Sequence, residues 1–494
     1  MSNNWIIEQR DFKMKFVSQK LLLLALSACI LLLHASLSQA KERPLNIVLV
    51  LVDDLGWTDL SCQGSKYFET PNVDRLAAEG IRFTNGYAAC AVCSPTRASV
   101  MTGRYPARVG VTDWIRARFQ GGTVPPAGTV VDEYVGGKNR ALLCPRNPLY
   151  MEHSETTLAE ILGEAGYVSC HIGKWHLGPD DWYPQKQGFT YNFGGCDLGQ
   201  PHSYFDPYTT NRRPEGIPTL QARQPGEYLT DREGDEAVNF IRKHKDDPFF
   251  LYLANYAVHT PLGAKKELIE KYQAKPATNQ KNATYAGMVE SVDDAVGNVM
   301  KVLDELKLAD NTLIIFSSDN GGLLGPTHNA PLRSGKGFPY EGGIRVPYIV
   351  RWPGVVKPKQ INDTPVCSID FLPTILDACG VEKSKDTEID GVSLLPLLQS
   401  EGRLGDRPLF WHFPHYRFAR GPYSIVRDGD WKMIYWFEED GVELFNLTDD
   451  LSETTDLAAK EPARVAALKK QLEQWYVTSG AKLPKKNPLY VGKK

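Results

Sequence analysis

Acidic and amide side chains follow two apolar runs of this sequence. Asp53 and Asp54 end the run NIVLVLVDD, and Asp319 and Asn320 end the run TLIIFSSDN. Oxygen-bearing side chains of this kind suit a hard cation such as Ca²⁺ or Mg²⁺ better than zinc. Each pair taken alone is also typical of a solvated turn or a helix cap. Together they indicate a divalent-cation site, provided that the fold brings the two run ends side by side.

A cysteine stands at the expected start of a helix in CSPTRASVMTGRYP. Pro95 suits a first helical turn, and residues 98–102 can continue it. Cys93 then lies beside unpaired backbone N–H groups, and such a helix end stabilises negative charge. The residues alone leave two other interpretations open, a thiol nucleophile of low pKa and a simple buried cysteine.

Basic side chains elsewhere in the chain are of the types that complete an anion site. GKWHLG sets Lys174 and His176 two residues apart, so both point to the same side of an extended segment. The single histidine of NYAVHTP, His259, would more often be structural than catalytic. Cationic donors can bind the oxygens of a tetrahedral anion, and an acid can protonate a departing alcohol. The candidates for these tasks are Arg97, Lys174, His176, His259 and Lys336.

The elements that must position these residues alternate along the chain. The continuous apolar run from Leu45 to Asp54 predicts a strand buried on both faces of a parallel sheet. Further strands are expected at 167–174, 249–258 and 312–320, and helices at 70–80, 157–166 and 282–306. Alternation at this spacing predicts an α/β fold with a mostly parallel sheet, in which ligands bind beyond the carboxyl ends of the strands.

The pattern changes after about Gly391. YSIVRDGDWKMIYWFEEDGVELFNL alternates and turns at RDGD and EEDG, which predicts an antiparallel meander, and a helix is expected from Pro462 to Tyr476. We therefore expect a catalytic domain over residues 41–390 and a smaller C-terminal α+β domain over residues 391–494.

Five blocks of the sequence, in this order, resemble the type I, formylglycine-dependent sulfatases: NIVLVLVDDLGW, CSPTRASVMTGRYP, GKWHLG, SSDNGG and GKGFPYEGGIRVP. This family is arylsulfatase-like and belongs to the alkaline-phosphatase superfamily. The resemblance implies a large mixed, mostly parallel sheet sandwiched by helices. It also implies that a formylglycine-generating or sulfatase-maturing enzyme converts Cys93 to formylglycine. Ca²⁺ is favoured over Mg²⁺ as the cation.

The resemblance further assigns roles. The cation would be held by Asp53, Asp54, residue 93, Asp319 and Asn320. Hydrated formylglycine attacks sulfur, the alcohol leaves, and the second hydroxyl then drives the release of sulfate. Arg97 would orient the diol, Lys174 and Lys336 would bind sulfate, and His176 would act as the base. The acid is Lys336 or His259, and the sequence leaves this choice open.

The substrate is expected to be a sulfated small molecule or glycan, with a carbohydrate as the leading candidate. Long loops at 115–148 and 179–233 are of the kind that carries specificity. The segment from Trp411 to Tyr423 mixes aromatic residues with Arg417 and Arg420, which suits either sugar binding or a packed interface between domains. GQPHSYFDPY adds His202 or Ser203 as a further polar residue without deciding between them. The alternatives are a phosphodiester or phosphonate monoester hydrolase of the same superfamily and a non-catalytic protein that binds sulfated glycans.

Composition and the N-terminus set the remaining limits. The formal net charge of −3 disfavours a nucleic-acid partner. Residues 1–40 are typical of a signal peptide, with basic residues before the apolar run 21–40 and a cleavage site after Ala40. The protein is therefore expected in the periplasm or outside the cell. No stable membrane span is expected after cleavage. A membrane anchor and lipid attachment at Cys29 are the alternatives.

Overall fold

The central strand of the structure, a computed structural model, is β1 (Asn46–Val52), and each of its residues is buried. Its side chains alternate between two apolar cores. Val48 and Val50 contribute to one core, whereas Ile47 and Leu49 contribute to the other. Because successive strand residues point to opposite faces, this division places β1 in the middle of a sheet that is covered on both sides.

The strands around β1 form an eight-stranded sheet among the described residues, in the order β11-β2-β10-β9-β1-β8-β6-β7. β1 is parallel to its neighbours β8 (Phe249–Ala254) and β9 (Thr312–Ser318). β10 is antiparallel to both of its neighbours, which makes the sheet mixed. The other strands are β2 (Ile81–Phe83), β6 (Val168–Gly173), β7 (Tyr191–Phe193), β10 (Tyr348–Arg351) and β11 (Gln360–Asn362). The predicted mostly parallel sheet is confirmed.

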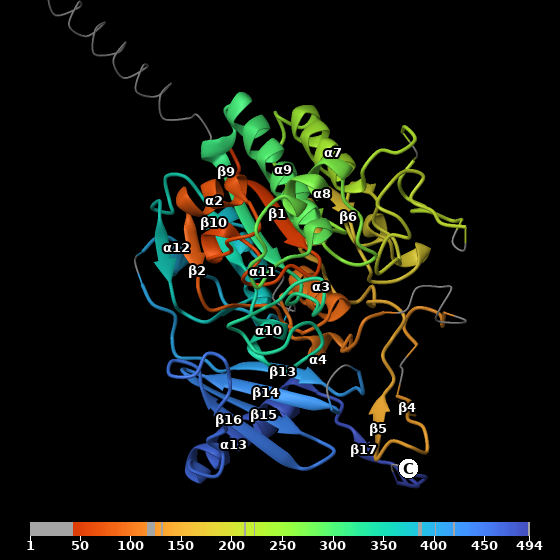
Figure 1. Ribbon diagram of the computed structural model, residues 1–494, viewed down its shortest axis with the longest axis vertical. Helices are drawn as coiled ribbons and strands as arrows, with labels where there is room; N and C mark the ends of the chain where they lie inside the picture. Colours follow the sequence, from red (N-terminus) through yellow and green to blue (C-terminus); the bar gives the residue numbers. More distant parts are fainter. Residues whose placement is uncertain are drawn as a thin grey trace, which may run out of the picture. The chain divides into compact units, whose positions relative to one another are not determined.

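Helices cover both faces of this sheet (Figure 1). The core on one side contains residues of α2 (Pro71–Ala78), α7 (Leu229–Lys243), α8 (Lys266–Gln273) and α9 (Ala283–Glu305). The core on the other side contains residues of α3 (Cys93–Thr102), α6 (Leu158–Glu164), α11 (Phe371–Cys379) and α12 (Leu395–Leu398). The sheet therefore holds α3, with Cys93 at its first position, against one face.

The N-termini of two helices show how far the local sequence determines where a helix begins. Thr157 and Glu160 form the expected capping box of α6. Thr70 precedes α2 as expected, but its side chain makes no capping bond. Asp293 of α9 instead accepts hydrogen bonds from the backbone N–H groups of Asn72 (3.1 Å) and Val73 (2.7 Å). The first turn of α2 is thus satisfied by a distant carboxylate.

The C-terminal part contains the expected antiparallel sheet, formed by β13 (Leu409–Phe413), β14 (Tyr423–Asp428), β15 (Trp431–Trp436) and β16 (Gly441–Asn446). α13 (Pro462–Ser479) contributes Leu468 and Leu472 to its core. The same core includes residues 89–92, directly before Cys93. A small sheet joins β17 (Lys485–Lys486), β5 (Leu142–Pro145) and β4 (Tyr134–Val135). Other short elements, besides 3-10 turns, are β3 (Gly86–Tyr87), β12 (Val366–Cys367), α4 (Pro106–Val109) and α10 (Glu341–Ile344).

A buried charge cluster connects this C-terminal sheet to the loop that carries Lys336. Lys432 of β15 forms ion pairs with Glu341 (2.9 Å) and Glu453 (2.8 Å), and all three side chains are fully buried. The backbone N–H of Glu341 also donates to Glu453 (2.6 Å). Glu341 begins α10 only five residues after Lys336, so the cluster fixes one end of that loop.

The structure describes residues 43–115, 124–129, 132–211, 214–221, 223–383, 388–400, 402–417 and 420–492. The expected signal peptide and Cys29 lie outside these ranges. Within them no helix has both the length and the apolar character needed to cross a membrane. Residues from Leu45 onward form one compact unit, and the domain boundary at 390/391 stays a prediction.

Candidate active site

The ends of β1 and β9 bring four polar side chains together. Val52 pairs with Ser318 in the parallel register, so the residues that follow lie next to each other. The backbone N–H of Asp54 donates to Asp319 Oδ1 (3.2 Å), and Asn320 Nδ2 donates to Asp54 Oδ1 (2.7 Å). Asp53, Asp54, Asp319 and Asn320 are all buried. Residues more than 260 positions apart thus share one site at the carboxyl edge of the sheet.

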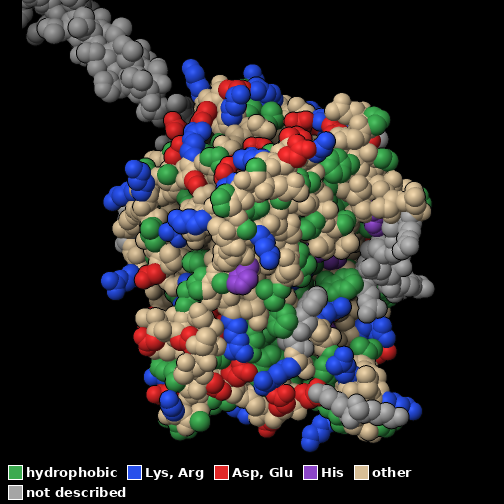
Figure 2. Space-filling model, in the orientation of Figure 1, with side chains coloured by type: hydrophobic (Ala, Val, Ile, Leu, Met, Phe, Trp, Pro, Cys, Tyr) green, Lys and Arg blue, Asp and Glu red, His purple; other side chains and the backbone are tan. Residues whose placement is uncertain are grey.

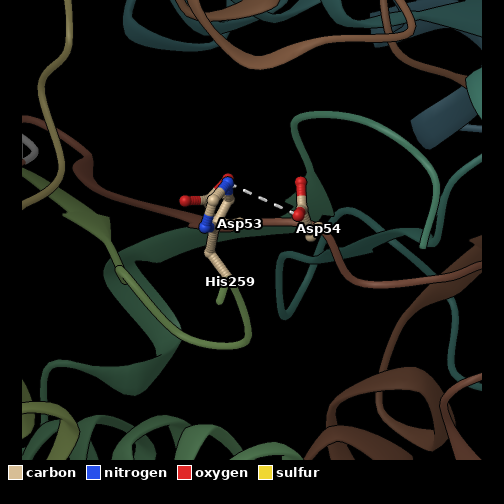
Figure 3. Close-up of side chains that lie close together, drawn as sticks. All are labelled: Asp53, Asp54 and His259. Carbon is tan, nitrogen blue, oxygen red and sulfur yellow. Dashed lines mark ion pairs between the residues drawn. The ribbon is translucent and has the colours of Figure 1, made fainter. Parts of the chain in front are cut away.

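The chemistry of these donors fits a bound cation. Asp53 Oδ1, Asp54 Oδ2 and Asn320 Oδ1 are buried oxygens with no hydrogen-bond donor among the described residues. Ligand atoms of Asp53, Asp54 and His259 lie within 4.8 Å of one another (Figure 3). Burying an unpaired oxygen costs free energy unless a cation or donor satisfies it. A set dominated by carboxylate and amide oxygens is suited to Ca²⁺ or Mg²⁺.

Cys93 lies at the N-terminus of α3 and is 3% exposed. Its Sγ atom is 3.4 Å from Nδ1 of His176. Burial raises the pKa of the Cys93 thiol above its usual value, although Lys174 and Lys336 act in the opposite direction. The thiol is therefore protonated and a poor nucleophile in this setting, which argues against a cysteine hydrolase of the thiolate type.

The ring of His176 has a defined orientation. Nε2 lies 2.7 Å from the carbonyl oxygen of Ile115, which can only accept a hydrogen bond, so Nε2 carries the proton. Burial, followed by the charge of Lys174, lowers the pKa of His176 well below its usual value. The neutral ring consequently turns the lone pair of Nδ1 toward residue 93. A side chain oriented in this way is suited to accept a proton there.

Arg97 is buried one turn along α3 from Cys93. Its Nε donates to Asp319 Oδ2 (2.9 Å), and Nη1 donates to the backbone carbonyl of Lys174 (2.7 Å). The guanidinium thus joins the end of β9 to the segment after β6. Because its fork is rigid, Arg97 fixes the relative positions of residue 93, Asp319 and Lys174.

Two lysines and a histidine complete the site around the carboxylates. Lys174 Nζ is 2.6 Å from Asp53 Oδ2, and Lys336 Nζ is 2.7 Å from Asp54 Oδ1. His259 Nε2 is 3.6 Å from Asp54 Oδ2. Burial of its ring, together with the charge of Lys336, lowers the pKa of His259 to about 3. The structure therefore brings every residue of the expected site into one cluster.

Three positions that shape this cluster could not be recognised from residue types and spacing. The carbonyl of Ile115 orients His176, and a backbone atom leaves no trace in residue type. The Trp114 ring lies 6.5 Å from the His176 ring. A Cβ atom on Gly199 would lie 2.6 Å from Cε1 of His176, so only glycine fits there without a shift.

The structure bears on two segments whose role the sequence left open, GQPHSYFDPY and residues 411–423. Ser203 Oγ donates to the carbonyl of Phe205 (3.1 Å), so this hydroxyl is used within its own loop. Trp411 is 2% exposed and donates from Nε1 to the carbonyl of Ala88 (2.7 Å), as expected for a packed interface. Arg417 instead pairs with Asp113 (2.6 Å) beside the site.

Comparison with known proteins agrees with this arrangement. The model of the sulfatase family matches residues 45–381. The chain belongs to the sulfatase family. A second model, that of the C-terminal part of N-sulphoglucosamine sulphohydrolase, matches residues 334–478. The protein is thus a sulfuric ester hydrolase, and its family implies a formylglycine and a divalent metal.

Individual sulfatases are similar over most of the chain. A sulfatase of Formosa agariphila is 34% identical over an alignment of 517 positions that covers 90% of each protein. The N-acetylgalactosamine-6-sulfatase of Homo sapiens is 37% identical over 397 residues, 76% of this chain and 69% of the human protein. The crystal structure of Ps i-CgsB in complex with k-i-k-neocarrahexaose has a TM-score of 0.73 and 31% identity, covering 88% of this chain and 93% of that one.

Proposed function

We propose that this sulfatase removes sulfate from a sulfated carbohydrate, using Ca²⁺ and a formylglycine derived from Cys93. The observation that carries the proposal is the arrangement at residue 93, which faces the lone pair of His176 at 3.4 Å within a buried cluster of cations and unsatisfied oxygens. Two relatives support the choice of substrate, because one is an N-acetylgalactosamine-6-sulfatase and the other was crystallised with a neocarrahexaose.

The chain's own residues divide the remaining tasks. Formylglycine at position 93, once hydrated, would supply a nucleophilic hydroxyl, and a bound cation would polarise a sulfate oxygen. Lys174 and Lys336 bring ammonium groups to the carboxylates and can bind sulfate oxygens in the same space. Arg97 holds the helix end in place. The residues that would hold the ion are Asp53, Asp54, Asp319 and Asn320, together with residue 93.

Proton transfer is assigned to His176, which contacts residue 93, and to Lys336 or His259. His176 takes a proton at Nδ1, because Nε2 is already bonded to Ile115. Lys336 and His259 both lie beside Asp54, and one of them protonates the departing alcohol. Lys336 lies 2.7 Å from Asp54 Oδ1 and His259 lies 3.6 Å from Asp54 Oδ2, which supports either residue as the acid.

A substrate panel tests this function. Protein produced together with a formylglycine-generating enzyme should release sulfate from para-nitrophenyl sulfate and from 6-sulfated N-acetylgalactosamine, and hydrolyse bis-para-nitrophenyl phosphate and a phosphonate monoester more slowly. Faster turnover of the diester would favour the phosphodiesterase alternative. Binding of sulfated sugars without any sulfate release would instead favour a glycan-binding protein.

The proposal includes export and maturation. A secretory signal over residues 1–40 would bring the protein to the periplasm or the exterior, where sulfated polysaccharides are found, with the maturation enzyme as an earlier partner. N-terminal sequencing of exported protein should begin after Ala40. A lipid-modified Cys29 at the N-terminus would contradict this cleavage site.

A further inference from the structure

A pocket of about 700 Å³ lies beside the active site and is separate from its catalytic residues. Its lining comes from three segments, residues 113–114, residues in the range 125–149 and residues 415–417. Trp114 is common to both places, since it lines the pocket and its ring lies 6.5 Å from that of His176. Pockets of this volume are of the size that holds a drug-sized ligand, which leaves room for a sugar unit.

The charges of this pocket are almost fully paired, with one exception. Asp113 is paired with Arg417 (2.6 Å), Glu133 with Arg146 (2.6 Å) and Asp132 with Lys482 (3.5 Å). Arg140 is exposed and has no carboxylate partner among the residues that the structure describes. The lining holds three acidic and three basic side chains and so carries no net charge, but Arg140 is the basic lining residue that forms no ion pair with the described carboxylates and is available to an anion.

The position of Arg140 is fixed by its surroundings. Its guanidinium lies 4.4 Å from the ring centroid of Tyr416, whose hydroxyl accepts a hydrogen bond from the backbone N–H of Leu142 (3.2 Å). Arg417 lies over Trp114 in the same way, also at 4.4 Å. Pairs of a guanidinium and an aromatic ring present N–H donors beside flat apolar surface, which suits a sugar ring that carries an acidic group.

The attraction to an anion is local. Figure 2 shows basic and acidic side chains interspersed over the face drawn, without one broad basic field. A long-range field would attract any polyanion, whereas a single unpaired guanidinium selects a group placed at one distance from the reacting sulfate.

We propose that this pocket binds the sugar next to the sulfated one, and that Arg140 binds a carboxylate or second sulfate on that sugar. The proposal rests on the proposed function and narrows the substrate class to acidic oligosaccharides. The pocket determines which chains bind, while the cluster around residue 93 carries out the reaction.

The test compares kcat/KM for two kinds of substrate in matched variants. One is para-nitrophenyl sulfate, which ends at the sulfate site. The other is a panel of acidic oligosaccharides whose terminal sugar is a 6-sulfated N-acetylgalactosamine or a sulfated galactose. The sugar next to it is a glucuronate or a second sulfated sugar. Each oligosaccharide is assayed both as a substrate and as a competitor of the aryl sulfate.

In Arg140→Ala the preference for the best acidic oligosaccharide over the aryl sulfate should fall about tenfold, the size of one lost charged contact. Lys138→Ala removes the same charge two residues away, outside the pocket, and should keep the preference within about twofold.

Two results would overturn the inference. One is an unchanged preference in Arg140→Ala for every member of the panel. The other is an equal loss in Arg140→Ala and Lys138→Ala. Failure of the proposed function gives a different result, because the wild-type protein would then release sulfate from neither the aryl sulfate nor any sulfated sugar.

Discussion

Lys432→Met should destabilise the protein far more than the loss of a surface ion pair. Lys432 is the shared partner of Glu341 and Glu453 at 2.9 and 2.8 Å, and none of the three side chains is exposed. Removing it leaves two buried carboxylates without their common cation, and breaking such a pair costs about 3–5 kcal/mol. With about 2.1 cal/mol/K per residue, the unfolding entropy of 494 residues is about 1 kcal/mol/K. The melting temperature should therefore fall by about 3–5 °C.

Differential scanning calorimetry at a fixed scan rate measures this loss. The control is Arg242→Met, which removes a pair with Glu305 whose side chains are 50% and 41% exposed, and it should cost less than about 1 kcal/mol. Burial raises the pKa of Glu453 to about 7, and Lys432 acts against that shift. Without Lys432 a protonated Glu453 is tolerated better than an ionised one, so Lys432→Met should lower the melting temperature more at pH 8 than at pH 6. Equal losses for the two variants, or no dependence on pH, would refute the reasoning.

Three further results are expected. Gly199→Ala should lower kcat by about 10- to 100-fold with little change in melting temperature, because its Cβ would displace His176, and unchanged kcat would contradict this close contact. Burial raises the pKa of Asp293 to about 6 from 3.8, so its stabilisation is full below pH 4 and is lost as the pH rises toward 6. In urea titrations the unfolding free energy of the wild type relative to Asp293→Asn should fall by about 2 kcal/mol between about pH 4 and pH 6, and a flat difference would be inconsistent with the shift. His259→Gln and Lys336→Met are compared on a series of aryl sulfates, and the variant that lacks the acid should slow the substrates with poor leaving groups most. If both variants slow all substrates equally, neither residue is the acid.

Elements with a strong local pattern could be predicted from the sequence. β1, β9 and α9 begin and end within two residues of their expected bounds, because an apolar run or a helical period is a property of neighbouring residues. The capping box of α6 follows from the same local logic. The start of α2 does not, since a carboxylate from α9 reaches it only after folding.

The site shows the same division. The residue types at 93, 174 and 319 suggest anion and cation chemistry, and the order of the five sequence blocks favours that interpretation over a buried cysteine or a solvated turn. The contact between Ile115 and His176 and the fit of Gly199 depend on where loops cross, which residue type does not encode. The pairing of Arg417 with Asp113 likewise joins segments about 300 positions apart.

The most direct test of the central claim is to identify the atom that attacks sulfur. Cys93→Ser keeps one hydroxyl at this position but lacks the second hydroxyl that expels sulfate. After incubation with para-nitrophenyl sulfate, mass spectrometry of the peptide spanning residue 93 should show the gain of one sulfo group on that serine, with at most one equivalent of nitrophenol released. An unmodified peptide, or sustained turnover by this variant, would contradict the account.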